Sequence, residues 1–203
     1  MDESMNEEVK PTPHMDDPGL ACFQHVMGEC RCYLEYGSGG STVYAATVAK
    51  VPMIISIESD KIWFEKVVRS IAPYTNGGRF LHYCDIGPVG PWGMPVDRSK
   101  VENYWQYFTL PWRIAFQNNC APDVVLIDGR FRVASFLFSL ISARVGTTIL
   151  FDDYLDRKEY FVVERFSPIV DAKGRMALFK VARNYSTQDL CERIAQYSVL
   201  PGI

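Results

Sequence analysis

The chain has 203 residues, of which 48% are hydrophobic and 22% are charged, which is the composition of a globular domain with a full core. Its formal net charge of −3 excludes a strongly basic surface, so we expect no bulk binding of nucleic acid. Residues 1–17 carry acids and prolines but no apolar run, which argues against a secretory signal or a membrane anchor. We therefore expect a flexible tail over residues 1–17 and one domain over residues 18–203, with no membrane partner.

Six cysteines are spread along the chain, and they contain no pair of CxxC modules. The two nearest to each other, in Cys30-x-Cys32, have no matching second pair, so a zinc site is not expected. Reduced and mostly buried thiols in a cytoplasmic protein are the better interpretation.

A glycine-rich stretch separates an expected strand from an expected helix. The strand is predicted over residues 33–36, and a segment of helical composition follows over residues 43–51. Between them stand Gly37, Gly39 and Gly40, where a side chain would block a tight turn and the close approach of a ligand. An α/β protein brings its backbone to a cofactor through this order of elements, and the free N–H groups at the helix start suit a carboxylate or phosphate.

The acidic residue before the glycines indicates which cofactor to expect. The spacing Gly37-x-Gly39-x-x-Thr42 matches the dinucleotide-binding pattern only in part, because that pattern has a third glycine where Thr42 stands. The seven residues EYGSGGS at 35–41 resemble instead the first motif of the class I S-adenosylmethionine-dependent methyltransferases. A glycine-rich turn without a ligand is the alternative at this point.

That resemblance implies a role for each part of the loop. The backbone at the glycines would pass close to the methionine end of S-adenosylmethionine. Glu35 would order the loop and meet the charged amino-acid end of the cofactor, directly or through water. The residues that the motif assigns to cofactor binding are Glu35, Gly37, Ser38, Gly39 and Ser41.

A near-continuous apolar run, MIISIE at residues 53–58, predicts a parallel strand that is covered on both faces. It ends in Glu58, about twenty residues after the glycines, where a carboxylate can accept hydrogen bonds from both hydroxyls of a ribose. We expect Glu58 to hold the cofactor ribose, and a solvated acid at a strand end is the alternative.

A third strand is expected over residues 79–84, directly before Asp85. In the family that the chain resembles, the residues after this strand contact the adenine of the cofactor. The resemblance therefore implies that Asp85 accepts a hydrogen bond from the exocyclic amine of adenine, and that Ile86 packs on the ring.

The least regular stretch of the chain, residues 86–103, is rich in glycine and proline. A loop of this length is uncommon in a compact domain and is usually functional or disordered. We expect it to form a wall or lid of the substrate site, and a stabilising flap packed on the sheet is the alternative. Arg98, Lys100 and Arg113 would favour an anionic substrate if they face the site.

Acids also end the next two expected strands. Residues 124–127 form a fourth strand that ends at Asp128. Residues 147–151 form a fifth strand that is followed by Asp152 and Asp153. Open α/β sheets place functional groups at this end of their strands.

The eight residues PDVVLIDG at 122–129 resemble the fourth-strand motif of small-molecule methyltransferases in the branch that includes catechol O-methyltransferases. In metal-dependent members of that branch, acids at these places hold one divalent ion, so the resemblance implies a Mg²⁺ site at Asp128, Asp152 and Asp153. The sequence departs from the branch at its catalytic lysine, where Phe131 stands. Without a metal, Asp152 or Asp153 would cap a helix or hold the fifth loop.

The last part of the chain predicts an antiparallel hairpin, because residues 168–170 and 176–182 flank the turn signal DAKG at 171–174. Helices are expected over residues 156–166 and 187–198. The terminal hairpin agrees with the topology of the family. We expect one three-layer α/β sandwich with a Rossmann-like, seven-stranded, mainly parallel sheet that ends in this hairpin.

Together the motifs predict an enzyme that transfers a methyl group from S-adenosylmethionine to an oxygen or nitrogen atom of a small-molecule acceptor. Asp128 would lie at the cofactor as well as on the substrate side, and the candidate general bases are Asp128, Asp152 and Asp153. A protein that binds S-adenosylmethionine or S-adenosylhomocysteine without turnover is one alternative, because the family's lysine is missing. A nucleotide-sugar or dinucleotide enzyme is another alternative, which Thr42 disfavours. The sequence also leaves open whether the protein forms a homodimer.

Overall fold

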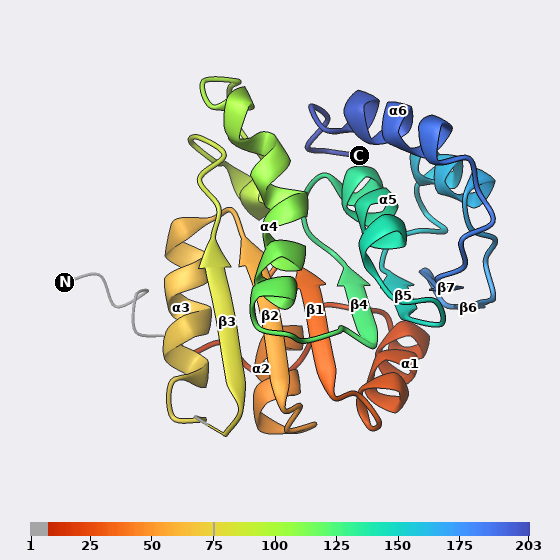
Figure 1. The fold of residues 1–203 in the computed structure, drawn as a ribbon. Coiled ribbons are helices and arrows are strands. Elements are labelled where there is room, and N and C mark those ends of the chain that lie inside the picture. Colours follow the sequence, from red (N-terminus) through yellow and green to blue (C-terminus); the bar gives the residue numbers. More distant parts are fainter. Residues whose placement is uncertain (1–7, 75) are drawn as a thin grey trace.

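Seven strands form one sheet in the order β3-β2-β1-β4-β5-β7-β6. The computed structural model describes residues 8–74 and 76–203, and Figure 1 shows the sheet between helices on both faces. Parallel pairing joins β1 to β2 and β4, while β7 runs antiparallel to both β5 and β6. The strands are β1 (Cys32–Tyr36), β2 (Met53–Glu58), β3 (Gly78–Tyr83), β4 (Val124–Ile127), β5 (Thr148–Phe151), β6 (Asp171–Lys173) and β7 (Met176–Lys180).

The helices alternate with the strands along most of the chain. The α-helices are α1 (Asp17–Met27), α2 (Gly40–Thr47), α3 (Lys61–Ile71), α4 (Tyr104–Gln117), α5 (Arg132–Ser142) and α6 (Thr187–Tyr197). The 3-10 helices are η2 (Pro91–Gly93), η3 (Val101–Asn103) and η4 (Lys158–Arg165). Among the residues that the structure describes, every helix is too short or too polar to cross a membrane.

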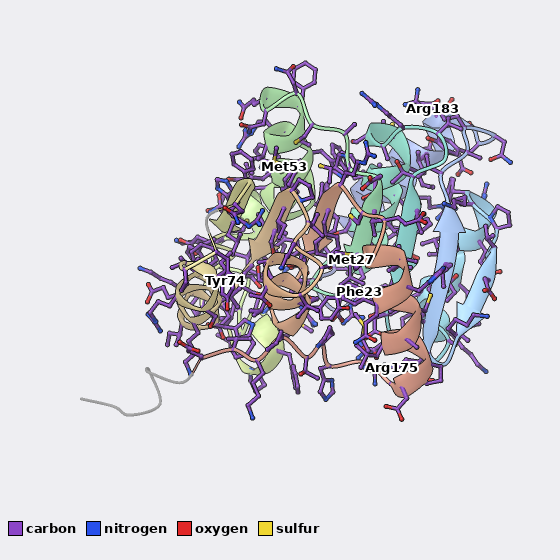
Figure 2. All side chains as sticks on the ribbon, turned by 90° about the horizontal axis from the view of Figure 1, so that it is seen from below. Phe23, Met27, Met53, Tyr74, Arg175 and Arg183 are labelled. Carbon is purple, nitrogen blue, oxygen red and sulfur yellow. The ribbon has the colours of Figure 1, made fainter. Side chains whose placement is uncertain are left out.

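Two hydrophobic clusters fill the two faces of the sheet, because successive side chains of a strand point to opposite faces. Tyr33 of β1 joins the cluster covered by α1, α2 and α3, where Phe23 and Met27 are buried residues of α1 (Figure 2). The next residue, Leu34, joins the larger cluster under α4, α5 and α6. This arrangement confirms the predicted three-layer sandwich with a terminal antiparallel hairpin.

The carboxyl ends of β1, β2, β4 and β5 meet at one edge of the sheet, because these strands are parallel. The glycine loop follows β1, Glu58 ends β2, and Asp128 follows β4. The fold therefore brings the residues singled out in the sequence to one edge, where open α/β sheets carry their ligand sites.

One local prediction near the C-terminus is wrong, and another is confirmed as a shorter helix of the 3-10 type. Residues 171–174 were predicted to be the hairpin turn, but Asp171–Lys173 is strand β6, and the turn lies at Gly174 and Arg175, with Gly174 at φ +59°. All three residues of β6 are exposed, so no apolar alternation marked the strand in the sequence. The helix expected over residues 156–166 is the 3-10 helix η4.

The described part of the expected N-terminal tail also differs from the prediction. Val9 N donates to Ser70 Oγ at 2.8 Å on α3, and the Arg175 Nη2 group donates to His14 O at 2.6 Å beside the hairpin. Asp16 caps α1 and also accepts from Arg175 N at 3.0 Å. Residues 8–16 thus follow the face of the sheet that carries α1–α3, while residues 1–7 lie outside the described part.

The six cysteines are free thiols, as expected. Cys30, Cys32 and Cys84 are buried, whereas Cys191 is exposed.

Candidate functional site

The turn after β1 can be made only by a glycine. Gly37 has φ +91°, and its N donates to Ile57 O at 3.0 Å on the adjacent strand. A Cβ on Gly37 would lie 2.8 Å from Gly129 Cα, because the turn after β1 packs directly against the turn after β4. The two turns that carry the predicted motifs therefore touch.

Thr42 explains why the third glycine of the dinucleotide pattern is absent. Its Oγ1 accepts from Gly39 N at 2.8 Å and donates to the carboxylate of Glu35. The side chain closes the loop onto the start of α2 as a capping box does. A glycine at this position could make neither bond.

Glu35 lies completely buried beneath the glycine loop. Its carboxylate accepts from Ser41 Oγ at 2.8 Å, from Ser56 Oγ at 2.9 Å and from Tyr33 OH at 2.9 Å, in addition to Thr42. Burial raises the pKa of Glu35, and these hydroxyl donors act against the rise. Glu35 orders the loop as predicted, and its complete burial favours the predicted contact to the cofactor through water over a direct one.

The two serines of the loop turn their side chains inward. Ser38 Oγ lies 2.6 Å from Ser56 Oγ, and Ser41 Oγ is taken by Glu35. Both serines are buried. A ligand at this loop would therefore meet backbone groups rather than these two hydroxyls.

Glu58 joins the glycine loop to the start of α3. Its Oε2 accepts from Ser38 N at 3.0 Å, while its Oε1 accepts from Ser59 N at 2.7 Å and from Asp60 N at 2.9 Å. Burial raises the pKa of Glu58 to about 7, although the three backbone N–H groups favour the carboxylate. The 3-10 helix η2 lies close by, since Ser59 Oγ donates to Gly93 O at 3.3 Å. The loop of residues 86–103 therefore reaches the position predicted for the ribose.

The two residues predicted to contact the adenine have different environments: Asp85 is partly exposed and Ile86 is buried. Asp85 forms an ion pair with Lys100 and accepts from Gly87 N at 3.1 Å, and its side chain is 42% exposed. The hydrogen bond from Lys100 is the main cause of a lowered pKa at Asp85. Ile86 is completely buried in the larger hydrophobic cluster, so the structure does not support its predicted packing on an adenine ring.

Arginines surround the three acids that were predicted to hold a metal. The Asp–Arg cluster consists of Asp128, Asp152, Asp153, Arg132, Arg157 and Arg175. One oxygen from each acid lies within 4.8 Å of the others. Arg132 lies 3.0 Å from Asp128 Oδ1 and 3.4 Å from Asp153 Oδ2. Arg175 lies 3.2 Å from Asp152 Oδ2 and 2.8 Å from Asp153 Oδ1.

This arrangement does not fit a divalent cation. Mg²⁺ needs carboxylate oxygens that are free to coordinate it, yet guanidinium groups contact five of the six oxygens of these acids. Arg132 is buried and also donates to Gly129 O at 3.0 Å and Asp152 O at 2.9 Å, so it is held between the two loops. The predicted Mg²⁺ site disagrees with the cluster, in which three guanidinium groups face three carboxylates.

Comparison with solved structures identifies the family. A methyltransferase-like protein from Silicibacter pomeroyi is 34% identical, with a TM-score of 0.84, over 95% of this chain and 99% of that chain. The chain belongs to the class I S-adenosylmethionine-dependent methyltransferase family. No protein-family model matches the chain, and no curated protein matches it.

Other solved structures are less similar to this chain. The cofactor-bound protein Rv0187 from MTB is 17% identical, with a TM-score of 0.53, over 87% of this chain and 85% of that chain. An O-methyltransferase from Bacillus cereus in complex with SAH is 14% identical, with a TM-score of 0.46, over 93% and 70% of the two chains.

The arginines of the Asp–Arg cluster were not predicted from the sequence, although the spacing of two of them indicates ion pairs. Arg132 stands four residues after Asp128, and Arg157 stands four residues after Asp153, which is a spacing that favours ion pairs. Arg175 left no such signal, because it lies on the hairpin turn and meets Asp152 only in the folded protein.

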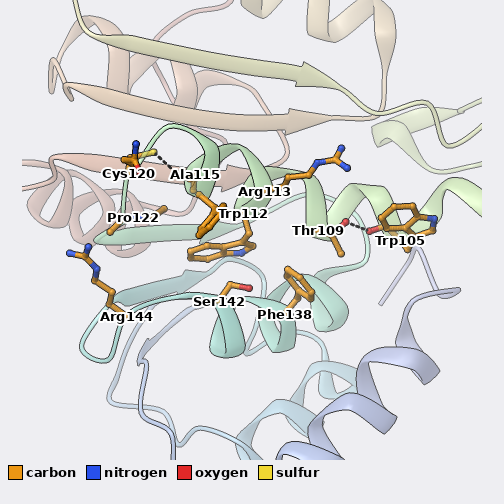
Figure 3. Close-up of a pocket in the computed structure, with 13 residues that line it drawn as sticks. Trp105, Thr109, Trp112, Arg113, Ala115, Cys120, Pro122, Phe138, Ser142 and Arg144 are labelled. Atoms are coloured by element: carbon orange, nitrogen blue, oxygen red, sulfur yellow. Dashed lines mark hydrogen bonds between the residues drawn. The ribbon is translucent and has the colours of Figure 1, made fainter.

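The aromatic segment after the long loop lines a separate groove of the methyltransferase. This groove, of about 810 Å³, lies between α4 and α5 (Figure 3). Trp105, Trp112 and Phe138 line it together with Arg113 and Arg144, and none of the predicted site residues does. Arg113 thus lies outside the candidate site.

A smaller hollow of about 270 Å³ lies where the long loop meets the C-terminal residues. Arg98 lines it together with Tyr104 and Pro201. The Tyr104 ring lies 4.9 Å from the Phe131 ring, and Phe131 N donates to Pro201 O at 3.1 Å. This hollow therefore adjoins the loop after β4.

Proposed function

We propose that this protein transfers a methyl group from S-adenosylmethionine to an oxygen or nitrogen atom of a small-molecule acceptor. The observation that carries the proposal is the bond from Ser38 N to Glu58 Oε2, at 3.0 Å. It joins the glycine turn, which has no room for a side chain at Gly37, to a carboxylate at the end of the adjacent strand. Membership of the methyltransferase family supports S-adenosylmethionine as the ligand of this loop.

The loop and Glu58 would hold the two ends of the cofactor. Backbone groups of Gly37, Ser38, Gly39 and Ser41 would face its methionine end, while Glu58 would accept hydrogen bonds from the ribose hydroxyls. Glu58 would keep its three backbone donors and use the remaining lone pairs of its oxygens.

Asp128 is the best candidate for a general base. Its Oδ2 is the one oxygen of the six in the cluster that no guanidinium group of the described residues contacts. Burial raises the pKa of Asp128 to about 7, although the guanidinium of Arg132 acts against the rise. A base whose pKa lies near the working pH is effective in proton transfer.

The proposed reaction is a displacement at carbon. The cofactor supplies an electrophilic methyl group on a positively charged sulfur. A lone pair of the acceptor forms the new bond to that carbon while the carbon–sulfur bond breaks, and the electron pair of this bond stays on sulfur. Asp128 Oδ2 would take the proton that a hydroxyl or amine acceptor loses. The remaining contribution of the protein is the positioning of the two reactants.

Binding without turnover is a second candidate, and the environment of Phe131 favours it. Phe131 stands where the branch has its catalytic lysine, and it is completely buried against the rings of Tyr104 and Tyr107, at 4.9 and 5.5 Å. No proton acceptor can replace it without repacking this part of the core.

Calorimetric titration with S-adenosylhomocysteine tests the cofactor, and transfer of a labelled methyl group to a panel of phenols, hydroxy acids and amines tests turnover. We expect micromolar binding, about −8 kcal/mol. The Asp128→Asn variant should bind S-adenosylhomocysteine within about twofold of the wild type and lose at least about tenfold in turnover. Binding by the wild type without methylation of any acceptor would favour the second candidate, and absence of binding would contradict both.

A further inference from the structure

The side chain of one arginine in the candidate site forms no hydrogen bond or ion pair with the described residues. Arg130 follows Gly129 in the loop after β4, and its backbone N donates to Tyr107 OH at 3.2 Å. Its Nε is buried without a hydrogen-bond partner, and none of its side-chain nitrogens bonds to a residue in the described ranges 8–74 and 76–203. Burial, followed by repulsion from Arg132, lowers the pKa of Arg130.

Other arginines of the described structure have a buried Nε without a hydrogen bond, but they differ from Arg130. Arg79 donates through Nη1 to Val51 O at 3.0 Å. Arg193 donates through Nη1 to Gln196 Oε1 at 2.7 Å. Arg130 lacks such bonds, although a largely buried cation without a partner is unfavourable. An anionic group of a ligand could offset this unfavourable burial by accepting hydrogen bonds from the Arg130 guanidinium.

The local charge points to the same conclusion. The Asp–Arg cluster contains three carboxylates and three guanidinium groups, so its formal charges cancel. Arg130 adds a positive charge that forms no ion pair with a carboxylate of the described residues, although Asp128 attracts it. Its loop packs on the glycine turn, since a Cβ on Gly37 would lie 2.8 Å from Gly129 Cα. The loop that carries Arg130 therefore lies beside the turn that would hold the methionine end of the cofactor.

We infer that Arg130 binds an anionic group, a carboxylate or a phosphate, of the methyl acceptor. The planar guanidinium can hold either group through two parallel hydrogen bonds. The hollow of about 270 Å³ next to Phe131 offers space for the rest of the acceptor, and its lining contains both Arg98 and Asp97, whose formal charges cancel. This inference rests on the proposed function, since it names the substrate class of the same site.

The test measures the melting temperature with inorganic phosphate as the probe, against chloride at matched ionic strength. We expect a saturable rise for the wild type and for the control Arg113→Gln, whose arginine lies in the groove between α4 and α5. Arg130→Gln should weaken this effect at least about tenfold and should melt at a higher temperature than the wild type without phosphate, because it removes an unpaired charge. Absence of a saturable effect in the wild type, or an equal effect in Arg130→Gln, would overturn the inference.

Two further arms distinguish the source of the anion. If the anion belongs to the acceptor, phosphate should still raise the melting temperature at saturating S-adenosylhomocysteine. The affinity of Arg130→Gln for S-adenosylhomocysteine should then lie within about twofold of the wild-type value. 5′-Methylthioadenosine lacks the amino-acid carboxylate of S-adenosylhomocysteine. If Arg130→Gln weakens the binding of S-adenosylhomocysteine but not that of 5′-methylthioadenosine, the anion is the carboxylate of the cofactor, and the assignment to the acceptor is wrong. A phosphate effect in a protein that does not bind S-adenosylhomocysteine would contradict the proposed function and leave the anion site standing.

Discussion

Two groups of buried or half-buried carboxylates lie at the same edge of the sheet, and they are stabilised in different ways. Glu35 under the glycine loop is held by the hydroxyls of Tyr33, Ser41, Thr42 and Ser56, without a cation. The acids after β4 and β5 are held by the guanidinium groups of the Asp–Arg cluster. Neutral donors order a loop whose backbone remains open to a ligand, whereas the arginines occupy the oxygens that a metal would need.

The difference shows where this chain follows its family and where it departs from it. The glycine loop keeps the arrangement that the family motif predicts, because Glu35 and Thr42 fix the backbone from below. The loop after β4 keeps the acid but adds Arg132, which lies between Asp128 and Asp153. The predictions below disturb one group while the other serves as a reference.

The largest effect is expected from Arg132→Met. Removal of this buried guanidinium takes away the ion-pair partner of Asp128 and one of the three guanidinium groups that contact Asp153, which should lower the free energy of unfolding by about 3–5 kcal/mol. Urea unfolding followed by circular dichroism measures this change. The control Arg113→Met, at an exposed position on α4, should change stability by less than about 0.5 kcal/mol. A loss below about 1 kcal/mol for Arg132→Met would show that the cluster does not depend on this residue.

Glu35→Gln should have the next largest effect. The amide keeps the shape of the carboxylate, but its NH₂ group cannot accept from the hydroxyls that now donate to Glu35, at a cost of about 1–3 kcal/mol. The exposed Glu29→Gln is the matched control. Unfolding in urea should show the loss, and calorimetry should show weaker binding of S-adenosylhomocysteine, because the loop loses its support. Unchanged values in both assays would contradict the role of Glu35 in ordering the loop.

Glu58 should make cofactor binding depend on pH. Ribose hydroxyls would donate to its carboxylate and favour the ionised form, so a ligand should lower the raised pKa of about 7 and release a proton. Affinity for S-adenosylhomocysteine should therefore rise between pH 6 and pH 8. Calorimetry in buffers of different ionisation enthalpy measures the released proton. Glu58→Gln should bind about tenfold more weakly and lose most of the pH dependence, while Glu65→Gln on α3 should retain both.

Without ligand, Glu58 should make the free energy of unfolding decrease as the pH rises, whereas it makes the affinity for the ligand increase. Because the pKa of Glu58 is higher in the folded than in the unfolded protein, the folded state binds the extra proton between pH 4.5 and about 7. Its contribution to the free energy of unfolding should decrease as the pH rises through this range. Urea unfolding of the wild type and of Glu58→Gln at several pH values checks the sign, and a parallel pair of curves would contradict it.

The smallest effect is expected at the exposed ion pair between Lys100 and Asp85. Both side chains are 42% exposed, so Lys100→Met should change the free energy of unfolding by less than about 1 kcal/mol. If Asp85 contacts the adenine as predicted, Asp85→Ala should weaken the binding of S-adenosylhomocysteine more than Lys100→Met does. Calorimetry on the two variants compares them, and equal affinities would contradict the adenine role.

The sequence by itself determined the order of the elements and the place of the site. Local features were sufficient for this, because an apolar run such as residues 53–58 can only be a strand covered on both faces, and parallel strands bring their carboxyl ends together. The glycine at position 37 and the acid at position 58 were recognisable for the same reason, since each depends on the few residues around it.

The tertiary structure alone decided which groups these residues meet. Arg175 reaches Asp152 across 23 positions and His14 across 161, and no local pattern encodes such contacts. For the same reason, the sequence did not predict the contacts of residues 8–16 with α3 and the hairpin, nor the arginines that surround the acids at 128, 152 and 153. Burial is also a property of the folded chain. It encloses Glu35 beneath the glycine loop, raises the pKa of Glu58 and leaves the Arg130 Nε without a hydrogen-bond partner among the described residues, because each depends on what packs above and below the sheet edge.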